Sequence, residues 1–262
     1  MTGHDEDDLD LAQRLADEAD AVTFARFQSL DMQVQTKPDM TPVTDVDRAV
    51  ERLMRGLLID ARPDDAVHGE EYGSSGDADR IWVLDPIDGT KNFIRGVPVW
   101  ATLVGLLLEG TPVLGVVSAP ALGRRWWGVR GRGAHIGGQL VGEPRRLQVS
   151  TIASVSDASV SVSDAVGWAG RGMRQGLDRL IERAWRTRAY GDFWSHMLVA
   201  EGAVDISAEP DLAPWDMAAL VPVIEEAGGR CTALAGSPPL EGGNLLATNG
   251  HVHDEVLRLL PD

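Results

Sequence analysis

The stretch VLDPIDGTKNF, residues 83–93, decides how this sequence is interpreted. An apolar run leads into two aspartates, Asp85 and Asp88, which stand on either side of Pro86. Proline fixes its own φ and favours an extended residue before it, while an Asp-Gly pair favours a turn. Asp85 should therefore end a strand, and Asp88 should fold back toward it.

Two carboxylates this close create an electrostatic problem. At a separation of about 5 Å and an effective dielectric constant of about 20, they repel by roughly 3 kcal/mol. Such a pair requires either a shared proton or a metal ion. Taken alone, the stretch favours a solvated turn, with Asp85 capping the turn and Asp88 capping a helix.

Carboxylates elsewhere in the chain favour the metal. They are Glu70 and Glu71 in HGEEY, Asp216 in PWD, and Asp45 and Asp47 in VTDVD. Hard divalent cations such as Mg²⁺ bind carboxylate and carbonyl oxygens. Carboxylates from separate elements suit two neighbouring ions that activate a water and neutralise a leaving phosphate oxygen. The backbone amides of Gly89 and Thr90, at a predicted helix start, would then cradle the phosphate.

Composition limits the class of protein. The chain has 262 residues, 44% of them apolar, which is enough for a sizeable core in one large domain or two joined lobes. Its apolar runs are too short to span a membrane, and its acidic N-terminus lacks the pattern of a secretory signal, so we expect a cytoplasmic protein without a membrane partner. The formal net charge of −16 argues against a nucleic-acid partner. A phosphorylated substrate would need a bound cation to reverse this field locally.

Hydrophobic periodicity gives the order of elements. It predicts helices over 8–30 and 44–57, strands over 80–84 and 99–120 with a turn near 109–112, and a strand with a glycine-rich hairpin over 124–138. Further on it predicts strands near 158–163, 187–192, 204–209 and 244–250, alternating with helices over 173–185, 195–202, from Trp215 onward and over 251–260. This order indicates layered sheets and helices. A loop near 142–157 separates possible lobes of about 1–145 and 146–262 within a single domain, 1–262.

Three motifs carry a specific resemblance. The segments GEE, WVLDPIDGTKNF and WDMAALVPVIEEAGG, in this order, resemble the inositol monophosphatase-like family over nearly the whole chain. The resemblance implies an α+β fold, a layered αβαβα sandwich. It also implies a magnesium-dependent, lithium-sensitive phosphatase that acts on a small phosphorylated metabolite and commonly forms a homodimer.

The resemblance also implies roles for individual residues. The metal ligands for two or three Mg²⁺ ions would be Glu70, Asp85, Asp88, Asp216 and the carbonyl of Ile87, with Asp85 bridging two ions. The catalytic residues would be Asp47 and Thr90, as a water-activating pair, together with Glu70. The substrate-binding residues would be Asp88, Gly89, Thr90, Lys91, Arg188, Asp192, Glu209 and Asp216.

Alternatives stay open for several of these residues and for the substrate. Thr90 and Asp47 also fit simple helix-start positions, and Glu209 fits a solvated strand end. Lys91 replaces the second threonine of the DGTTNF found in many inositol phosphatases, and the segments TKNFIRGVPVWATLVGLL and RAYGDFWSHMLVAEGAVD resemble bacterial histidinol-phosphatases. We therefore expect L-histidinol phosphate as the substrate, with inositol 1-phosphate as the alternative. A catalytically silent protein that binds metal or a phosphorylated ligand is the alternative from another class.

Overall fold

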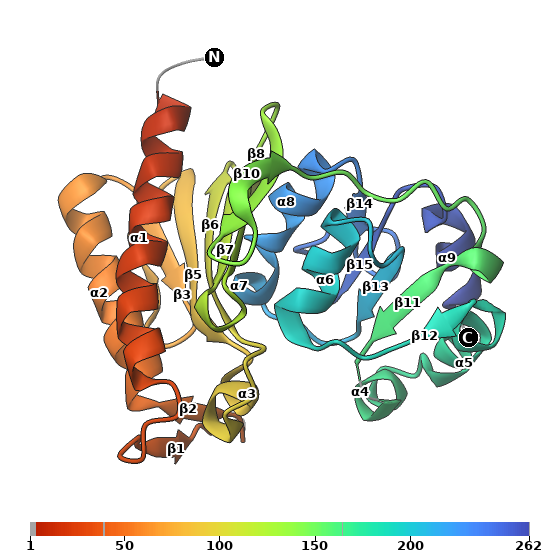
Figure 1. Ribbon diagram of the computed structural model, residues 1–262, viewed down its shortest axis with the longest axis horizontal. Coiled ribbons are helices and arrows are strands. Elements are labelled where there is room, and N and C mark those ends of the chain that lie inside the picture. The colour runs from red at the N-terminus through yellow and green to blue at the C-terminus, as the bar shows by residue number, and fades with distance from the viewer. Residues whose placement is uncertain (1–3, 39, 164, 262) are drawn as a thin grey trace.

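The protein is built of five layers in the order helix, sheet, helix, sheet, helix (Figure 1). The computed structural model describes residues 4–38, 40–163 and 165–261. The layered αβαβα sandwich expected from the sequence is confirmed. Within the described ranges, none of the helices is both long enough and apolar enough to cross a membrane.

Two helices form the first layer, α1 (His4–Arg26) and α2 (Asp45–Ala61), and they cover one face of the larger sheet (Figure 1). Leu11, Leu15 and Ala19 of α1 are buried against the sheet, as their helical spacing predicts. The predicted extension of this helix to residue 30 is wrong. The chain leaves the helix after Arg26, and Gln28 adopts a left-handed backbone with φ 63°.

The second layer is a sheet of eight described strands in the order β10-β9-β8-β7-β6-β5-β3-β4. All neighbours are antiparallel except β3 and β5, which are parallel. The predicted turn near 109–112 is confirmed between β6 and β7. The strands are β3 (Ala66–Gly69), β4 (Gly73–Ser75), β5 (Arg80–Asp88), β6 (Ala101–Leu108), β7 (Thr111–Ala119), β8 (Arg124–Val129), β9 (Gly133–Gly138) and β10 (Gly142–Arg146).

A stripe of glycines allows the third layer to approach this sheet closely. Gly105, Gly115 and Gly128 are paired across β6, β7 and β8. A Cβ atom on Gly115 would lie 1.9 Å from the carbonyl oxygen of Ala219, so only glycine admits the helix backbone here. The single helix predicted from Trp215 onward is two helices at this contact. The third layer consists of α6 (Asp192–Ala200), α7 (Pro214–Met217) and α8 (Leu220–Glu226).

The second sheet has the strand order β12-β11-β13-β15-β14 and is covered on its outer face by the last helical layer (Figure 1). Most of its predicted strands are confirmed, but the one predicted near 187–192 is reduced to the two residues of β12. The strands are β11 (Ser159–Val162), β12 (Arg186–Thr187), β13 (Ile206–Glu209), β14 (Arg230–Thr232) and β15 (Leu245–Thr248). The outer helices are α4 (Ala165–Gly170), α5 (Arg174–Arg183) and α9 (His253–Leu259).

Short elements connect the layers. A two-stranded ribbon of β1 (Val34–Thr36) and β2 (Pro42–Thr44) lies in the segment predicted to be a loop between the first two helices. A one-and-a-half-turn helix, α3 (Thr90–Arg95), follows β5. Two 3-10 turns, Pro120–Leu122 and Val155–Asp157, complete the described elements.

A buried histidine links stability to pH. His253 is fully buried, and its ring nitrogens lie 2.9 Å and 3.0 Å from the hydroxyl oxygens of Thr248 and Thr232. Burial lowers its pKa to about 4, and the charge of Arg230 contributes. The unfolded chain binds a proton below a pH of about 6.5, whereas the folded protein does so only near its lower pKa. The free energy of unfolding should therefore fall as the pH drops from about 6.5 toward 4.

We predict that His253→Gln reduces this acid sensitivity. The loss in free energy of unfolding between pH 7 and pH 5 should shrink by about 2 kcal/mol, the value expected for one group with these two pKa values. Urea unfolding at the two pH values measures it. His251→Gln, at an exposed position two residues away, is the matched control and should leave the loss unchanged. An identical loss in wild type and His253→Gln would contradict the assignment.

Candidate active site

A cavity of about 660 Å³ opens where the two sheets and the middle helices meet. Its wall includes Glu70, Asp88 and Thr90 from the first half of the chain and Asp192 and Glu209 from the second. The segment 142–157, predicted to be a loop, contains β10 and a 3-10 turn, and residues on both sides of it line this one cavity.

The segment VLDPIDGTKNF forms the floor of the cavity, where the end of strand β5 is irregular. The pairing of β5 with β6 shifts register between Asp85 and Asp88, where Pro86 stands. The hydroxyl of Thr102 donates to the Pro86 carbonyl at 2.9 Å, and the Ile87 amide donates to Asp85 Oδ1 at 2.9 Å. The bulge brings Asp85 and Asp88 together, as the sequence predicts.

Gly89 turns the chain from this bulge into α3. Its φ is 82°, a left-handed conformation that suits glycine, and a Cβ atom would lie 2.9 Å from the Val99 carbonyl oxygen. Gly89, Thr90 and Lys91 consequently line the cavity at the start of α3.

Three predicted ligands converge here. Oxygens of Asp85, Asp88 and Asp216 all lie within 4.8 Å of one another. A backbone amide donates to each carboxylate: those of Ile87 to Asp85, Phe193 to Asp88 at 2.8 Å and Ala213 to Asp216 at 2.7 Å. These amides come from β5 and α6 and from the residue before α7, so three elements of two adjoining layers fix the cluster.

Burial and mutual repulsion raise the pKa values of all three carboxyls. Burial is the larger cause for Asp85 and Asp88, followed by neighbouring carboxylates, among them Glu70 for Asp85 and Asp192 for Asp88. Burial also raises the pKa of Asp216 to about 7, against the effect of the Ala213 amide. The arrangement therefore disfavours three free carboxylates and favours a bound cation or protons.

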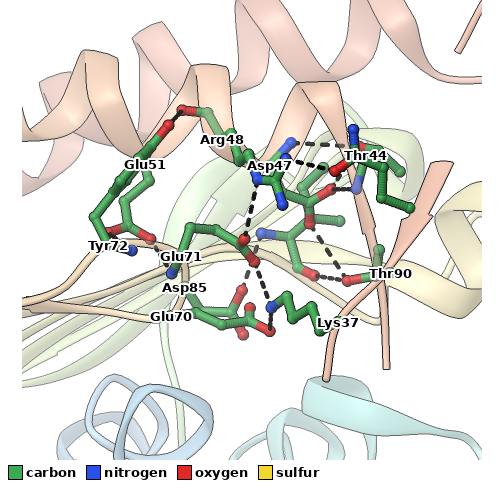
Figure 2. A network of polar contacts seen from close by, with 12 residues as sticks. Lys37, Thr44, Asp47, Arg48, Glu51, Glu70, Glu71, Tyr72, Asp85 and Thr90 are labelled. Atoms are coloured by element: carbon green, nitrogen blue, oxygen red, sulfur yellow. Dashed lines mark hydrogen bonds and ion pairs between the residues drawn. The ribbon is translucent and has the colours of Figure 1, made fainter. Parts of the chain in front are cut away.

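Glu70, the fourth predicted ligand, accepts a hydrogen bond from Lys37 beside this cluster. Lys37 Nζ lies 2.7 Å from Glu70 Oε1 and 2.5 Å from Glu71 Oε1, and Figure 2 shows it between the two carboxylates. Burial alone would lower the pKa of Lys37, but its hydrogen bonds and charge interactions with both glutamates outweigh this and raise it. Lys37 thus supplies positive charge beside the cluster from the segment between β1 and β2.

The predicted water-activating pair joins the start of α2, which carries Asp47, to the start of α3, which carries Thr90. Thr44 caps this helix, and its amide donates to Asp47 Oδ2 at 2.8 Å (Figure 2). Asp47 Oδ1 lies 3.4 Å from Thr90 Oγ1, which also lies 3.0 Å from the Ile87 carbonyl oxygen. Burial raises the pKa of Asp47 to about 6. The structure therefore brings Asp47, Thr90 and Ile87 together.

The predicted substrate residues divide into two groups. Lys91, Asp192 and Glu209 line the cavity, whereas Arg188 is exposed, is not among the lining residues, and donates to the Thr187 carbonyl. Asp192 begins α6 with a strained φ of 46° and accepts a hydrogen bond from Asn92 at 2.7 Å. Burial raises the pKa of the Asp192 carboxyl, opposed by the charge of Lys91.

Two further residues at the site were not predicted from the sequence. His196 lines the cavity and is 1% exposed; neither ring nitrogen has a hydrogen-bond partner among the described residues, and burial lowers its pKa to about 4. Glu51 is fully buried beneath the turn that carries Glu70 and Glu71. His196 lies within an apolar helical pattern, so the sequence gives no signal for it. Glu51 could have been found, because its spacing of four from Asp47 places both residues on one helix face.

The donor set fits magnesium. It consists of carboxylate and carbonyl oxygens, which hard cations prefer, and contains no thiolate or imidazole. The ion pairs found in the described parts of the chain do not involve Asp85, Asp88 or Asp216. Three clustered carboxylates without a cationic side chain of their own are the expected surroundings of a divalent ion.

Comparison with known proteins agrees with this chemistry. A sequence model of the inositol monophosphatase family matches residues 5–261. The chain belongs to the inositol monophosphatase family. It is therefore a phosphoric monoester hydrolase of a magnesium-dependent family.

Individual relatives cover almost the whole chain. It is 55% identical over 258 residues to a histidinol-phosphatase of Streptomyces coelicolor, covering 97% of each chain. It is 56% identical over 255 residues to a histidinol-phosphatase of Mycobacterium tuberculosis, covering 97% of this chain and 98% of that one. Among solved structures, an inositol monophosphatase from Zymomonas mobilis matches with a TM-score of 0.85 at 31% identity, covering 99% of each chain.

The repulsion within the cluster leads to a test in the absence of metal. Asp85→Asn keeps the acceptor for the Ile87 amide but removes one charge from the cluster. In EDTA at pH 8, we expect its free energy of unfolding to rise by roughly 3 kcal/mol, because two charges about 5 Å apart repel by that amount. Denaturant unfolding measures the change.

Asp65→Asn is the matched control, since that carboxylate is paired with Arg80 at 3.1 Å and accepts from Trp82 at 2.8 Å. This control should lose stability. If Asp85→Asn were destabilised to the same extent in EDTA, the cluster would not be under electrostatic strain.

Proposed function

We propose that this chain hydrolyses L-histidinol phosphate to L-histidinol and phosphate, acting as a single catalytic domain over residues 1–262. The carrying observation is the cavity, which places an acidic cluster beside Gly89–Lys91 at one end and further carboxylates, Asp192 and Glu209, in the same wall. The names of the two relatives above 50% identity support the choice of substrate.

The proposed metal ligands are Glu70, Asp85, Asp88, Asp216 and the Ile87 carbonyl, which would hold two or three Mg²⁺ ions. Bound magnesium would neutralise the phosphate and acidify a water. For Glu70 to take part, its carboxylate must exchange Lys37 for the cation, and Lys37 is then released toward Glu71 or the phosphate. Both partners of Lys37 are within hydrogen-bond distance, so the exchange requires only side-chain rotation.

Asp47 and Thr90 are proposed to manage the proton of the attacking water. The Thr90 hydroxyl has two acceptors within reach, Ile87 O and Asp47 Oδ1. If the Ile87 carbonyl binds a metal ion, the Thr90 hydroxyl would donate to Asp47. The Thr90 oxygen could then accept a hydrogen bond from the attacking water. Asp47 carries a raised pKa, so it is suited to take up a proton near neutral pH.

The same cavity would also suit a cationic leaving group. Histidinol carries an amine and an imidazole, and both can be positively charged. Asp192 and Glu209 provide carboxylates, while Lys91 at the start of α3 provides a positive charge on the phosphate side. This division of charge would orient the substrate with its phosphate toward the cluster. Arg188 has no part in this arrangement.

The cytoplasmic location and the homodimer stay predictions.

The central experiment compares kcat/KM for L-histidinol phosphate and inositol 1-phosphate at one magnesium concentration. We expect a preference of at least tenfold for histidinol phosphate, about 1.4 kcal/mol in transition-state terms. A tenfold preference in the opposite direction would make the chain an inositol phosphatase. A protein that binds magnesium but releases phosphate from no ester, a generic aryl phosphate included, would be a binding module.

Thr90→Ala tests the proton relay. We expect kcat to fall by about 100-fold or more, the usual scale for loss of acid–base assistance, while the magnesium affinity stays within a few-fold of wild type. Steady-state kinetics and calorimetric magnesium titration measure the two effects separately. Thr90→Ser, which retains the hydroxyl, is the control and should keep most of the turnover. Near-normal kcat in Thr90→Ala would remove the proposed role.

A further inference from the structure

Glu51 is a fully buried carboxylate under the metal-side turn. It belongs to α2, one helical turn after Asp47, and has no exposed surface. Three donors converge on it: the amides of Glu71 at 2.6 Å and Tyr72 at 3.2 Å, and Arg55 Nε at 2.8 Å. Figure 2 shows it reaching the turn that carries Glu70, Glu71 and Tyr72. A buried charge with this many partners fixes their relative positions.

The residue before Glu70 leaves room for this carboxylate. A Cβ atom on Gly69 would lie 2.2 Å from Glu51 Oε1 and 2.5 Å from its Cδ, so any side chain there would displace Glu51. Gly69 ends β3, and no left-handed backbone explains the glycine. The glycine of the GEE motif is therefore explained by the close approach of Glu51.

The Glu70 backbone is consequently fixed from two sides. Its own amide donates to the Leu84 carbonyl at 3.2 Å, next to Asp85 on β5. The following amide, of Glu71, donates to Glu51 on α2. The Glu70 side chain, by contrast, is bonded to Lys37 and can rotate. The peptide position is set, and the carboxylate remains free to exchange partners.

We infer that Glu51 is a positioning residue for magnesium: it holds the Glu70–Glu71 turn at the distance from Asp85 and Asp47 that cation binding requires. This inference rests on the proposed function, in which Glu70 is a metal ligand. One helix, α2, then aligns both the proton-accepting Asp47 and the ligand Glu70. A purely structural role for Glu51 would support the fold without affecting the cation.

Magnesium titration of the substrate-free protein by calorimetry separates the two roles. In Glu51→Gln, the side-chain amide would face backbone N–H donors, so the turn should shift. We expect the Kd for magnesium to rise by tenfold or more, and the magnesium concentration that gives half-maximal activity to rise with it. At saturating magnesium, kcat should recover to within a few-fold of wild type, because Glu51 touches no reacting atom.

Two further variants distinguish positioning from general destabilisation. Gly69→Ala keeps every charged side chain but displaces the Glu51 carboxylate, so its magnesium Kd should rise at least threefold. This variant decides the question if Glu51→Gln does not fold. Asp8→Asn is the matched control, since Asp8 is also a buried carboxylate paired with two arginines, Arg62 and Arg80, each at 2.8 Å. It should lower the melting temperature while keeping the magnesium Kd within twofold of wild type.

Each outcome decides the proposal. A magnesium Kd within twofold of wild type in a folded Glu51→Gln, or in Gly69→Ala where Glu51→Gln does not fold, would make Glu51 a residue of the fold only. An equal rise in Asp8→Asn would attribute the effect to general destabilisation and overturn the positioning role. A wild-type protein without magnesium binding would overturn the metal site and the inference together, whereas inactivity on histidinol phosphate with normal magnesium binding would overturn the substrate alone.

Discussion

The repulsion among Asp85, Asp88 and Asp216 is the constraint on which the rest of the structure depends. Their oxygens lie within 4.8 Å of one another in a site that raises all three pKa values. Hydrophobic packing alone would not keep such charges together. A backbone amide from a different element donates to each carboxylate, so the cluster exists only when strand β5 and helices α6 and α7 are all in place.

Close backbone approach makes this convergence possible. The helix layer that carries Asp216 rests on the glycine stripe of the larger sheet, where Gly105, Gly115 and Gly128 admit the backbone of α7 and α8. Gly69 plays the same part for Glu51. In both places the absent side chain allows a carboxylate-bearing segment to lie nearer than ordinary packing permits.

The sequence predicted local features of this site well and distant ones poorly. The bulge at Asp85–Asp88 follows from the chemistry of proline and Asp-Gly within one short segment. Asp216, Glu70 and Asp47 were assigned roles through motifs in separate segments, because no local rule states that those segments meet. Arg188 follows the end of β12 at Thr187, and its exposed side chain is not among those that line the cavity. Only long-range contacts place three further residues at the site: Lys37, Glu51 and His196.

The overall charge explains why the site needs positive charge beside its carboxylates. With a formal net charge of −16, the protein repels a phosphorylated metabolite at long range, and the cluster adds to that field. Lys37, held between Glu70 and Glu71, offsets part of this charge without occupying the position among the three aspartates. Under the proposed function, a divalent ion there would reverse the sign where the phosphate arrives, and Asp192 and Glu209 would add negative charge to the same cavity wall. Selectivity for a substrate that is anionic at one end and cationic at the other would then follow from the acidic composition of the chain.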